Sequence, residues 1–133
     1  MAIKWDGNVG INHTPAFQVS GAPYATGSIN GTSAVKVNFP YVTRWVVIIN
    51  NDTSNACKVG FSSTGVQGTN YFTVGKGATG QPTESNRMEL KVSELWLYGG
   101  TNVDVVAGLT SIPADRTSMG SGLPSWSGSA GVG

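Results

Sequence analysis

The run VTRWVVIIN at residues 42–50 constrains the fold more than any other part of this 133-residue chain. From Trp45 to Ile49 every residue is apolar, so an extended chain here presents apolar side chains to both of its faces. A strand on the surface of a two-layer fold would alternate apolar and polar residues instead. The run therefore predicts a strand whose second face is covered, either by loops of the same chain or by another protein.

Period-two alternation marks further strands along the chain. Apolar and polar residues alternate in SAVKVNF (33–39), CKVGFS (57–62) and TNVDVVAGL (101–109), and NYFTV (70–74) is typical of a short strand. The segments between them are rich in Gly, Asn, Ser and Thr, which favour turns over helices. We therefore expect loops at STGVQGTN and GKGATGQPTESN, and a hairpin turn at Gly99–Gly100.

Residues 83–98 are the one stretch long enough for a helix and free of Gly and Pro. Their spacing argues against a helix, because Leu90 and Val92 would lie about 200° apart around its axis. The alternation also changes phase at Glu94, after which Leu95 and Leu97 carry the apolar pattern. This predicts strands with a bulge or corner near Ser93–Glu94.

The pattern as a whole, with seven or eight strands and no expected helix, predicts an all-β fold: a two-sheet antiparallel sandwich. We favour a single jelly roll over an immunoglobulin-like arrangement because its eight strands match the count. The expected organisation is an extended N-terminal arm (1–32) with at most a short strand at Ala16–Ser20, a jelly-roll domain (33–116) and a Gly/Ser-rich C-terminal tail (117–133). The tail is either a loose terminus or a strap that becomes ordered against a neighbouring chain.

Composition narrows the range of partners and locations. Charged residues make up 11% of the chain, the net charge is +1 and no Lys/Arg cluster occurs, so nucleic acid is not an expected partner. No apolar run is long enough to span a bilayer, which predicts no membrane insertion. The N-terminus lacks an apolar signal region, so we expect a protein made in the cytoplasm and not secreted.

An enzymatic role is not expected, because no catalytic constellation is evident. His13 is the single histidine and lies in the predicted arm, away from any strand. GFSSTG (60–65) departs from the nucleophile-elbow pattern G-x-S-x-G, and we expect no helix after it. Glu89 and Glu94 could form a glycosidase pair, but Glu89 is better interpreted as a solvated side chain or a partner of Lys91.

Neither a metal nor a cofactor is expected. Cys57 is the only cysteine, which excludes an intramolecular disulfide, and the alternation of its strand predicts a buried, unreactive thiol. DTSN (52–55) has oxygen ligands at alternate positions but no bidentate acid at the distance that calcium loops require. The phosphate-binding glycine loop that ends in Lys-Ser/Thr is also missing from the sequence.

Trp96 and Tyr98 alternate with Leu95 and Leu97, so ELWLY is a second strand with two apolar faces. The aromatic pair could stack on carbohydrate, or it could pack against another protein. Since each fully buried Val, Ile or Trp contributes roughly 1.5–3 kcal/mol, such faces favour completion by assembly. The residues expected at interfaces are Trp5, Phe17, Trp45, Val47, Ile49, Trp96, Tyr98, Leu123 and Trp126.

The runs VTRWVVIINND, VGFSSTG, NYFTVGKG, RMELKVSELWLYGG and VDVVAGLTSIP together resemble the small single-jelly-roll capsid proteins of icosahedral double-stranded DNA viruses. The similarity spans residues 33–113, the WSGSAGVG ending is also similar, and the nearest resemblance is to the penton (vertex) proteins. This resemblance implies a homopentamer at each fivefold vertex of the virion, bordered by major and minor capsid proteins, with no catalysis and no cofactor. The alternatives are a capsid cement or decoration protein, and a carbohydrate- or receptor-binding module of a virion fibre.

Overall fold

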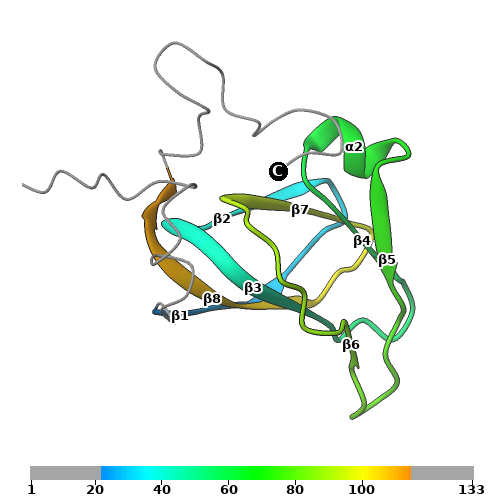
Figure 1. Cartoon of the computed structure of the whole chain (residues 1–133). Helices are drawn as coiled ribbons and strands as arrows, with labels where there is room; N and C mark the ends of the chain where they lie inside the picture. Colours follow the sequence, from blue (N-terminus) through cyan, green and yellow to red (C-terminus); the bar gives the residue numbers. More distant parts are fainter. Residues whose placement is uncertain (1–21, 115–133) are drawn as a thin grey trace, which may run out of the picture.

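The computed structural model describes residues 22–114, which form a two-layer β-sandwich with one short helix at its end (Figure 1). Its elements, in chain order, are β1 (Pro23–Ile29), β2 (Val35–Asn38), β3 (Tyr41–Asn50), β4 (Cys57–Gly60), α2 (Ser63–Gln67), β5 (Tyr71–Val74), β6 (Thr83–Glu84), β7 (Glu94–Tyr98) and β8 (Val103–Pro113).

The strands form two four-stranded sheets, and every strand pair is antiparallel. One sheet has the order β1-β8-β3-β6 and the other the order β2-β7-β4-β5. The predicted all-β, two-sheet antiparallel sandwich is confirmed. The described helix has five residues, too few to cross a membrane.

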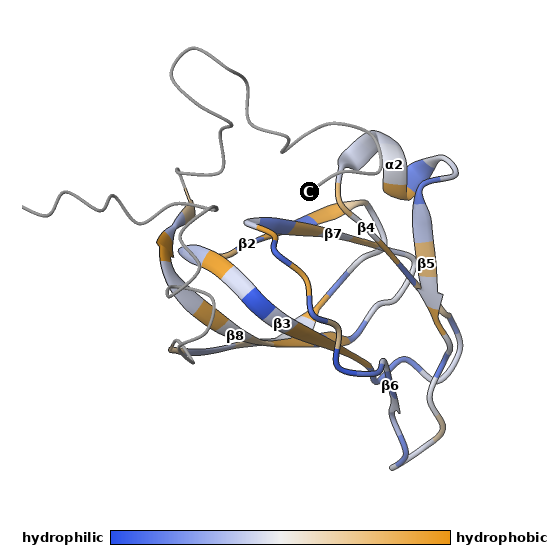
Figure 2. Cartoon of the chain, viewed as in Figure 1, coloured by the Kyte–Doolittle hydropathy of each residue, from blue (hydrophilic) through white to orange (hydrophobic). Residues whose placement is uncertain are grey.

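The core lies between the two sheets and is built by the alternation that the sequence shows. In β3, Val46 and Ile48 are fully buried while their neighbours are half-buried, and β7 places Leu95 and Leu97 in the same core. In β8 the apolar residues that recur at every second position are buried as well: Val103, Val105, Ala107 and Leu109. Figure 2 shows apolar residues spaced along the strands of both sheets. Each strand therefore turns one set of side chains inward and the other set outward.

Strand β1 lies inside residues 1–32, the segment that the sequence assigns to an extended arm. For residues 23–29 that assignment is wrong. Residues 23–29 instead form the edge of a sheet, paired with β8. Pro23 and Gly27 hide the alternation, and the strand is bulged between Thr26 and Ile29.

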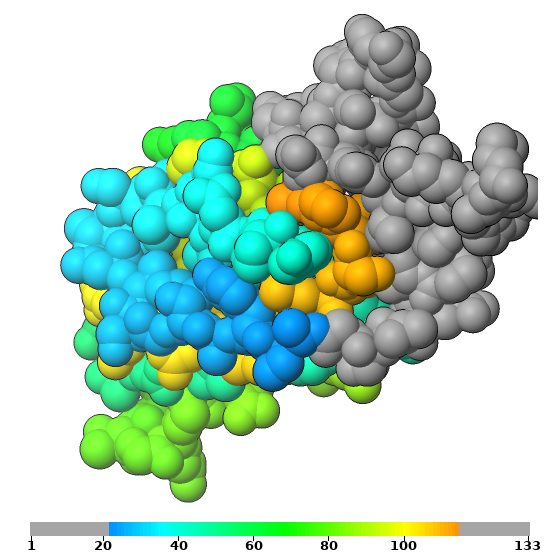
Figure 3. Space-filling view, turned by 90° about the vertical axis from the view of Figure 1, so that its left-hand side faces the viewer, coloured from blue at the N-terminus to red at the C-terminus, as the bar shows by residue number. Residues whose placement is uncertain are grey.

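Tyr24 ties β1 to the opposite sheet. Its ring meets Phe39 edge-on at 5.1 Å, and its hydroxyl donates to the Asn38 carbonyl at 3.3 Å. Figure 3 views this side of the molecule, where β1 (blue) and the region of β2 (cyan) lie side by side. Tyr24 therefore helps to close the edge of the sandwich.

The predicted loop STGVQGTN begins with helix α2, so that prediction is wrong. Ser62 caps the helix, because its hydroxyl accepts a hydrogen bond from the Gly65 amide at 2.9 Å. Val66 is fully buried where the helix lies against β4 and β7. A five-residue helix has no apolar period that can be recognised in sequence, and tertiary packing stabilises it instead.

The turn predicted at Gly99–Gly100 is not a hairpin. It connects β7 to β8, which lie in different sheets, so the chain crosses from one layer to the other. Gly99 has a φ of 102°, a conformation that glycine adopts without strain. Both a hairpin turn and a connection between sheets can require a residue with positive φ. The Gly-Gly pair in the sequence therefore does not show which of the two is formed.

Residues 85–93 follow the edge of β3 without forming a regular strand. The Met88 and Val46 backbones exchange two hydrogen bonds of 2.8 and 2.9 Å. Thr43 donates its hydroxyl to the Leu90 carbonyl at 2.6 Å. Strand β7 begins at Glu94, the point where the sequence pattern changes phase. The predicted corner therefore marks the passage of the chain from one sheet to the other.

Candidate functional site

The outer face of the β1-β8-β3-β6 sheet carries a cluster of apolar side chains, all half-buried except the exposed Ala25. Val47 lies opposite Val106, which in turn lies opposite Ala25 of β1. Trp45 and Ile49 flank Val47 on the same face of β3, and Asp104 forms the polar rim beside Ile49. We call this set, Ala25, Trp45, Val47, Ile49 and Val106, the apolar face.

Trp45 is partly covered by its own chain. Its indole lies over Gly108 of β8, where any side chain would overlap the ring. The guanidinium of Arg87, from the segment that follows β6, stacks on the indole at 5.2 Å from its centroid. The sequence predicts that the second face of β3 is covered either by loops of the same chain or by another protein. In the structure, a loop of the same chain covers part of that face.

The outer face of the β2-β7-β4-β5 sheet is different in character. The pairing places Trp96 between Lys36 and Gly60, and Tyr98 beside Lys58. Tyr71 of β5 lies beyond Gly60 and is 40% exposed. We call this set, Lys36, Lys58, Tyr71, Trp96 and Tyr98, the aromatic–lysine face.

The two lysines of this face have different surroundings. The ammonium of Lys36 lies 4.0 Å from the Glu94 carboxylate, which also accepts the indole N–H of Trp96 at 2.7 Å. Lys58 lies 4.7 Å from the ring centroid of Tyr71 and 5.9 Å from that of Tyr98. Within residues 22–114 Lys58 has no carboxylate at salt-bridge distance. Its charge is therefore stabilised by ring faces and solvent.

A hollow of about 350 Å³ opens beside Lys58 at the end of this face. It lies where the β3–β4 loop, the β7–β8 crossover and the loop before β2 converge. The residues that line it are Thr32, Asn55, Ala56, Lys58, Tyr98, Gly99 and Thr101.

Asp52 holds two of these walls together. Its carboxylate accepts five hydrogen bonds: from the Ser54 amide, from the Asn55 amide and side chain, and from the Thr101 amide and hydroxyl, at 2.7–3.2 Å. The amides of Ser54 and Thr101 and the Thr101 hydroxyl hold the pKa of Asp52 well below its ordinary value. The negative charge of Asp52 thus ties the β3–β4 loop to the β7–β8 crossover.

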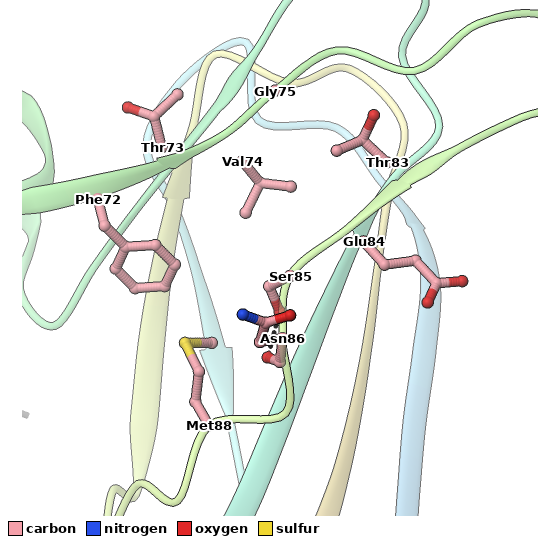
Figure 4. A pocket seen from close by; sticks show the side chains of 9 residues that line it. All are labelled: Phe72, Thr73, Val74, Gly75, Thr83, Glu84, Ser85, Asn86 and Met88. Carbon is pink, nitrogen blue, oxygen red and sulfur yellow. Dashed lines mark hydrogen bonds between the residues drawn. The ribbon is translucent and has the colours of Figure 1, made fainter.

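A second hollow of about 360 Å³ separates β5 from β6 and the segment after it (Figure 4). Phe72, Val74 and Met88 form its apolar side, and Glu84 is the one ionisable residue in its lining. The Ser85 hydroxyl accepts from the Ile48 amide at 2.9 Å and donates to the Asn86 carbonyl at 3.0 Å. This hollow holds no pair of groups suited to acid–base chemistry.

The residues that could have supported catalysis are engaged in structural contacts. Ser62 is buried and caps α2, so the helix after GFSS does not make this serine an exposed nucleophile. Glu89 pairs with Arg87 at 3.2 Å, not with Lys91 as the sequence interpretation allowed. Glu94 binds Trp96 and lies near Lys36. His13 lies outside the described residues.

The candidate metal ligands are likewise occupied. Cys57 is fully buried, and burial raises the pKa of its thiol. Both carboxylate oxygens of Asp52 already accept hydrogen bonds from protein donors. A calcium ion would have to replace these donors in order to bind the same oxygens. Among residues 22–114 no group of three or more His, Cys, Asp or Glu side chains could hold a metal ion.

The predicted interface residues fall on two separate faces. Trp45, Val47 and Ile49 belong to the apolar face, whereas Trp96 and Tyr98 belong to the other sheet. The remaining four, Trp5, Phe17, Leu123 and Trp126, lie outside the described residues.

The sequence interpretation missed Lys58 and Tyr71. The alternation of CKVG and NYFTV already turns them away from Cys57 and Phe72, but the alternation does not reveal that β4 lies between β5 and β7.

No protein-family model matches this chain, and neither the curated proteins nor the solved structures searched contain a significant match.

Proposed function

We propose that the sandwich is a single jelly roll and that the protein is a structural component of a virus capsid. The observation that carries the proposal is the nested pairing of strands: β1 with β8, β2 with β7, β3 with β6 and β4 with β5. This is the pairing of one long hairpin rolled up so that its strands alternate between two sheets, which is the arrangement of a jelly roll. Capsid subunits are among the proteins built on this arrangement.

Fold alone does not establish function, so the surface has to support the same role. The apolar face supports it, because Trp45, Val47, Ile49 and Val106 remain only half-buried in the described part of the chain. Neighbouring apolar side chains that stay accessible across two strands are typical of a surface that meets another protein. In a closed shell, such a face would be buried permanently against a neighbouring subunit.

The resemblance to penton proteins refines this to a homopentamer at the fivefold vertices. A fivefold ring uses a heterologous contact, in which one flank of each subunit meets a different flank of the next. Each contact requires roughly 800 Å² per partner to be specific. The partners that follow are further copies of this chain and the neighbouring capsid proteins of the virion.

Native mass spectrometry of the full chain tests the proposal. We expect a pentamer that dissociates when Val47→Asp places a charge on the apolar face. Thr73→Asp is the matched control, since Thr73 is exposed on β5 in the other sheet, and it should leave the pentamer intact. Circular dichroism of both variants checks that they are folded.

Two outcomes would contradict this assignment. A monomer at every accessible concentration would exclude an assembly role for the apolar face. A stable trimer would exclude the penton assignment and favour a cement or decoration protein instead.

A further inference from the structure

We propose that the hollow beside Lys58 is a binding site for an acidic saccharide, that is, a sugar carrying a carboxylate. The site goes beyond the structural role proposed above and does not depend on the number of subunits. It combines a cation, an aromatic wall and several small polar groups within one concave surface of about 350 Å³. This volume lies within the range of roughly 300–1,000 Å³ in which small-molecule sites are found.

Lys58 supplies the anion-binding group. Its ammonium lies 4.7 Å from the ring centroid of Tyr71 and 5.9 Å from that of Tyr98, and no carboxylate of the described chain lies at salt-bridge distance from it. A lysine held at a hollow without a carboxylate partner favours an anionic ligand, because a hydrogen bond between two charged groups is stronger than one between neutral groups. Lys36, on the same face, already has the Glu94 carboxylate nearby and lacks this property.

Tyr98 supplies the apolar wall. It is half-buried and lines the hollow, so part of its ring is available for contact with the carbon-bound hydrogens on one face of a sugar ring. Inorganic phosphate or sulfate would use Lys58 but gain nothing from this ring. The aromatic wall therefore favours an organic anion with a flat apolar side.

The remaining lining matches the hydroxyl groups of a saccharide. Thr32, Asn55 and Thr101 contribute two hydroxyls and an amide. Thr32 donates its hydroxyl hydrogen to Asn30 at 2.6 Å, which leaves its oxygen able to accept. The Asn55 amide and the Thr101 hydroxyl likewise donate to Asp52, so the side-chain oxygens of all three residues remain able to accept. A purely apolar ligand would cover these oxygens without offering them a donor, and this argues against a lipid or an aliphatic side chain.

Asp52 makes the site rigid. The side chains of Asn55 and Thr101 both donate to its carboxylate, at 3.2 and 2.7 Å, so the two loops are held in place before any ligand binds. A site ordered in advance loses less conformational entropy on binding. Asp52 acts here as a positioning residue and does not line the hollow.

The test is a titration of the isotope-labelled full chain with 3′-sialyllactose, with lactose as the matched neutral sugar, followed by NMR. We expect saturable shifts of the Asn55, Gly99 and Thr101 amides at millimolar 3′-sialyllactose and weak or no shifts with lactose. Lys58→Gln keeps a polar, unbranched side chain, one atom shorter, but removes its charge, and it should weaken binding roughly tenfold. Tyr98→Leu should also weaken binding, since it removes the ring while keeping an apolar side chain.

Lys36→Gln is the matched control, since it removes a lysine from the same face without touching the hollow; it should change the affinity by less than about twofold. Several results would overturn the proposal: equal binding of lactose, no binding at millimolar concentrations, or unchanged affinity in Lys58→Gln. Inorganic sulfate that binds as tightly as 3′-sialyllactose would show a simple anion site and would likewise overturn the saccharide assignment. The amide spectrum of each variant verifies folding independently of ligand.

Discussion

The two outer faces of the sandwich share a tryptophan but differ in the residues around it, which are aliphatic on one face and lysines and tyrosines on the other. On the apolar face, Val47 and Val106 lie side by side with no charged group between them, and Asp104 lies at the rim. On the aromatic–lysine face, Lys36 and Lys58 alternate with the rings along neighbouring strands. Covering the aliphatic groups of the first face leaves no polar group without a hydrogen-bond partner. On the second face, the lysine charges are stabilised by neighbouring rings and, for Lys36, by the Glu94 carboxylate. This difference is the reason that we propose a protein partner for the first surface and a small polar ligand for the second.

The largest expected loss of stability comes from a substitution on the inner side of β7, compared with one on its outer side. Leu97 is fully buried, and Leu97→Ala should lower the free energy of unfolding by about 2–5 kcal/mol through lost burial and a cavity. The adjacent Tyr98→Ala, on the aromatic–lysine face, should cost only about 1 kcal/mol. Urea denaturation measures both. Equal losses would mean that the outer face supports the fold as strongly as the core does, contrary to the comparison.

A smaller effect tests how the apolar face covers Trp45. Gly108→Ala places a methyl group where the indole lies, and should destabilise the fold by about 1–3 kcal/mol. Gly75→Ala is the control, because a Cβ at that position meets no atom within 4 Å. In a Trp45→Ala background the penalty of Gly108→Ala should largely disappear. A penalty that persists there would show that the indole is not the group displaced.

The ionised Asp52 makes the loops under the aromatic–lysine face sensitive to acid. Because its pKa is lowered on folding, the unfolded chain binds the proton more readily, and this contribution to stability is lost as pH falls below the ordinary aspartate value of about 3.9. Asp52→Asn should therefore be less stable than the wild type at pH 7, with a smaller gap at pH 3. Urea midpoints at the two pH values measure this. A gap independent of pH would contradict the role of the charge.

The smallest effect concerns the ion pair at the edge of the aromatic–lysine face. The Lys36 ammonium is 4.0 Å from Glu94 and its side chain is 40% exposed, so Lys36→Ala should cost less than about 1 kcal/mol. The loss should shrink further in high salt. Thermal unfolding at low and high salt measures it. A large loss independent of salt would mean that Lys36 stabilises the face by packing on Trp96 and not by its charge.

Much of the fold was predictable from local patterns. The alternation in residues 33–39 and 101–109 correctly identifies β2 and most of β8, and the phase change at Ser93–Glu94 correctly marks the start of β7. The errors occur where local signals are weak. Strand β1 contains Pro23 and Gly27, which interrupt its pattern, and α2 is too short to show a helical period.

The hollow beside Lys58 was not predictable, because its lining comes from three loops that are distant in sequence. Thr32, Asn55 and Thr101 meet only because β7 lies between β2 and β4 in one sheet and the crossover to β8 starts at the end of β7. The role of Asp52 was missed for the same reason, since one of its partners is Thr101, 49 residues away. From the sequence, the only functional role considered for DTSN was a calcium-binding loop.

The amino-acid order alone dictated which segments are extended and which side chains share a face, since a strand repeats every two residues whatever lies beside it. It also excluded an intramolecular disulfide through the single Cys57. The folded chain chose the neighbours: β8 between β1 and β3, β4 between β5 and β7, and therefore Lys58 between two tyrosines. The physical reason is that all strands share the same period and the same backbone hydrogen-bonding groups, so partner and register depend on packing between residues far apart in the chain.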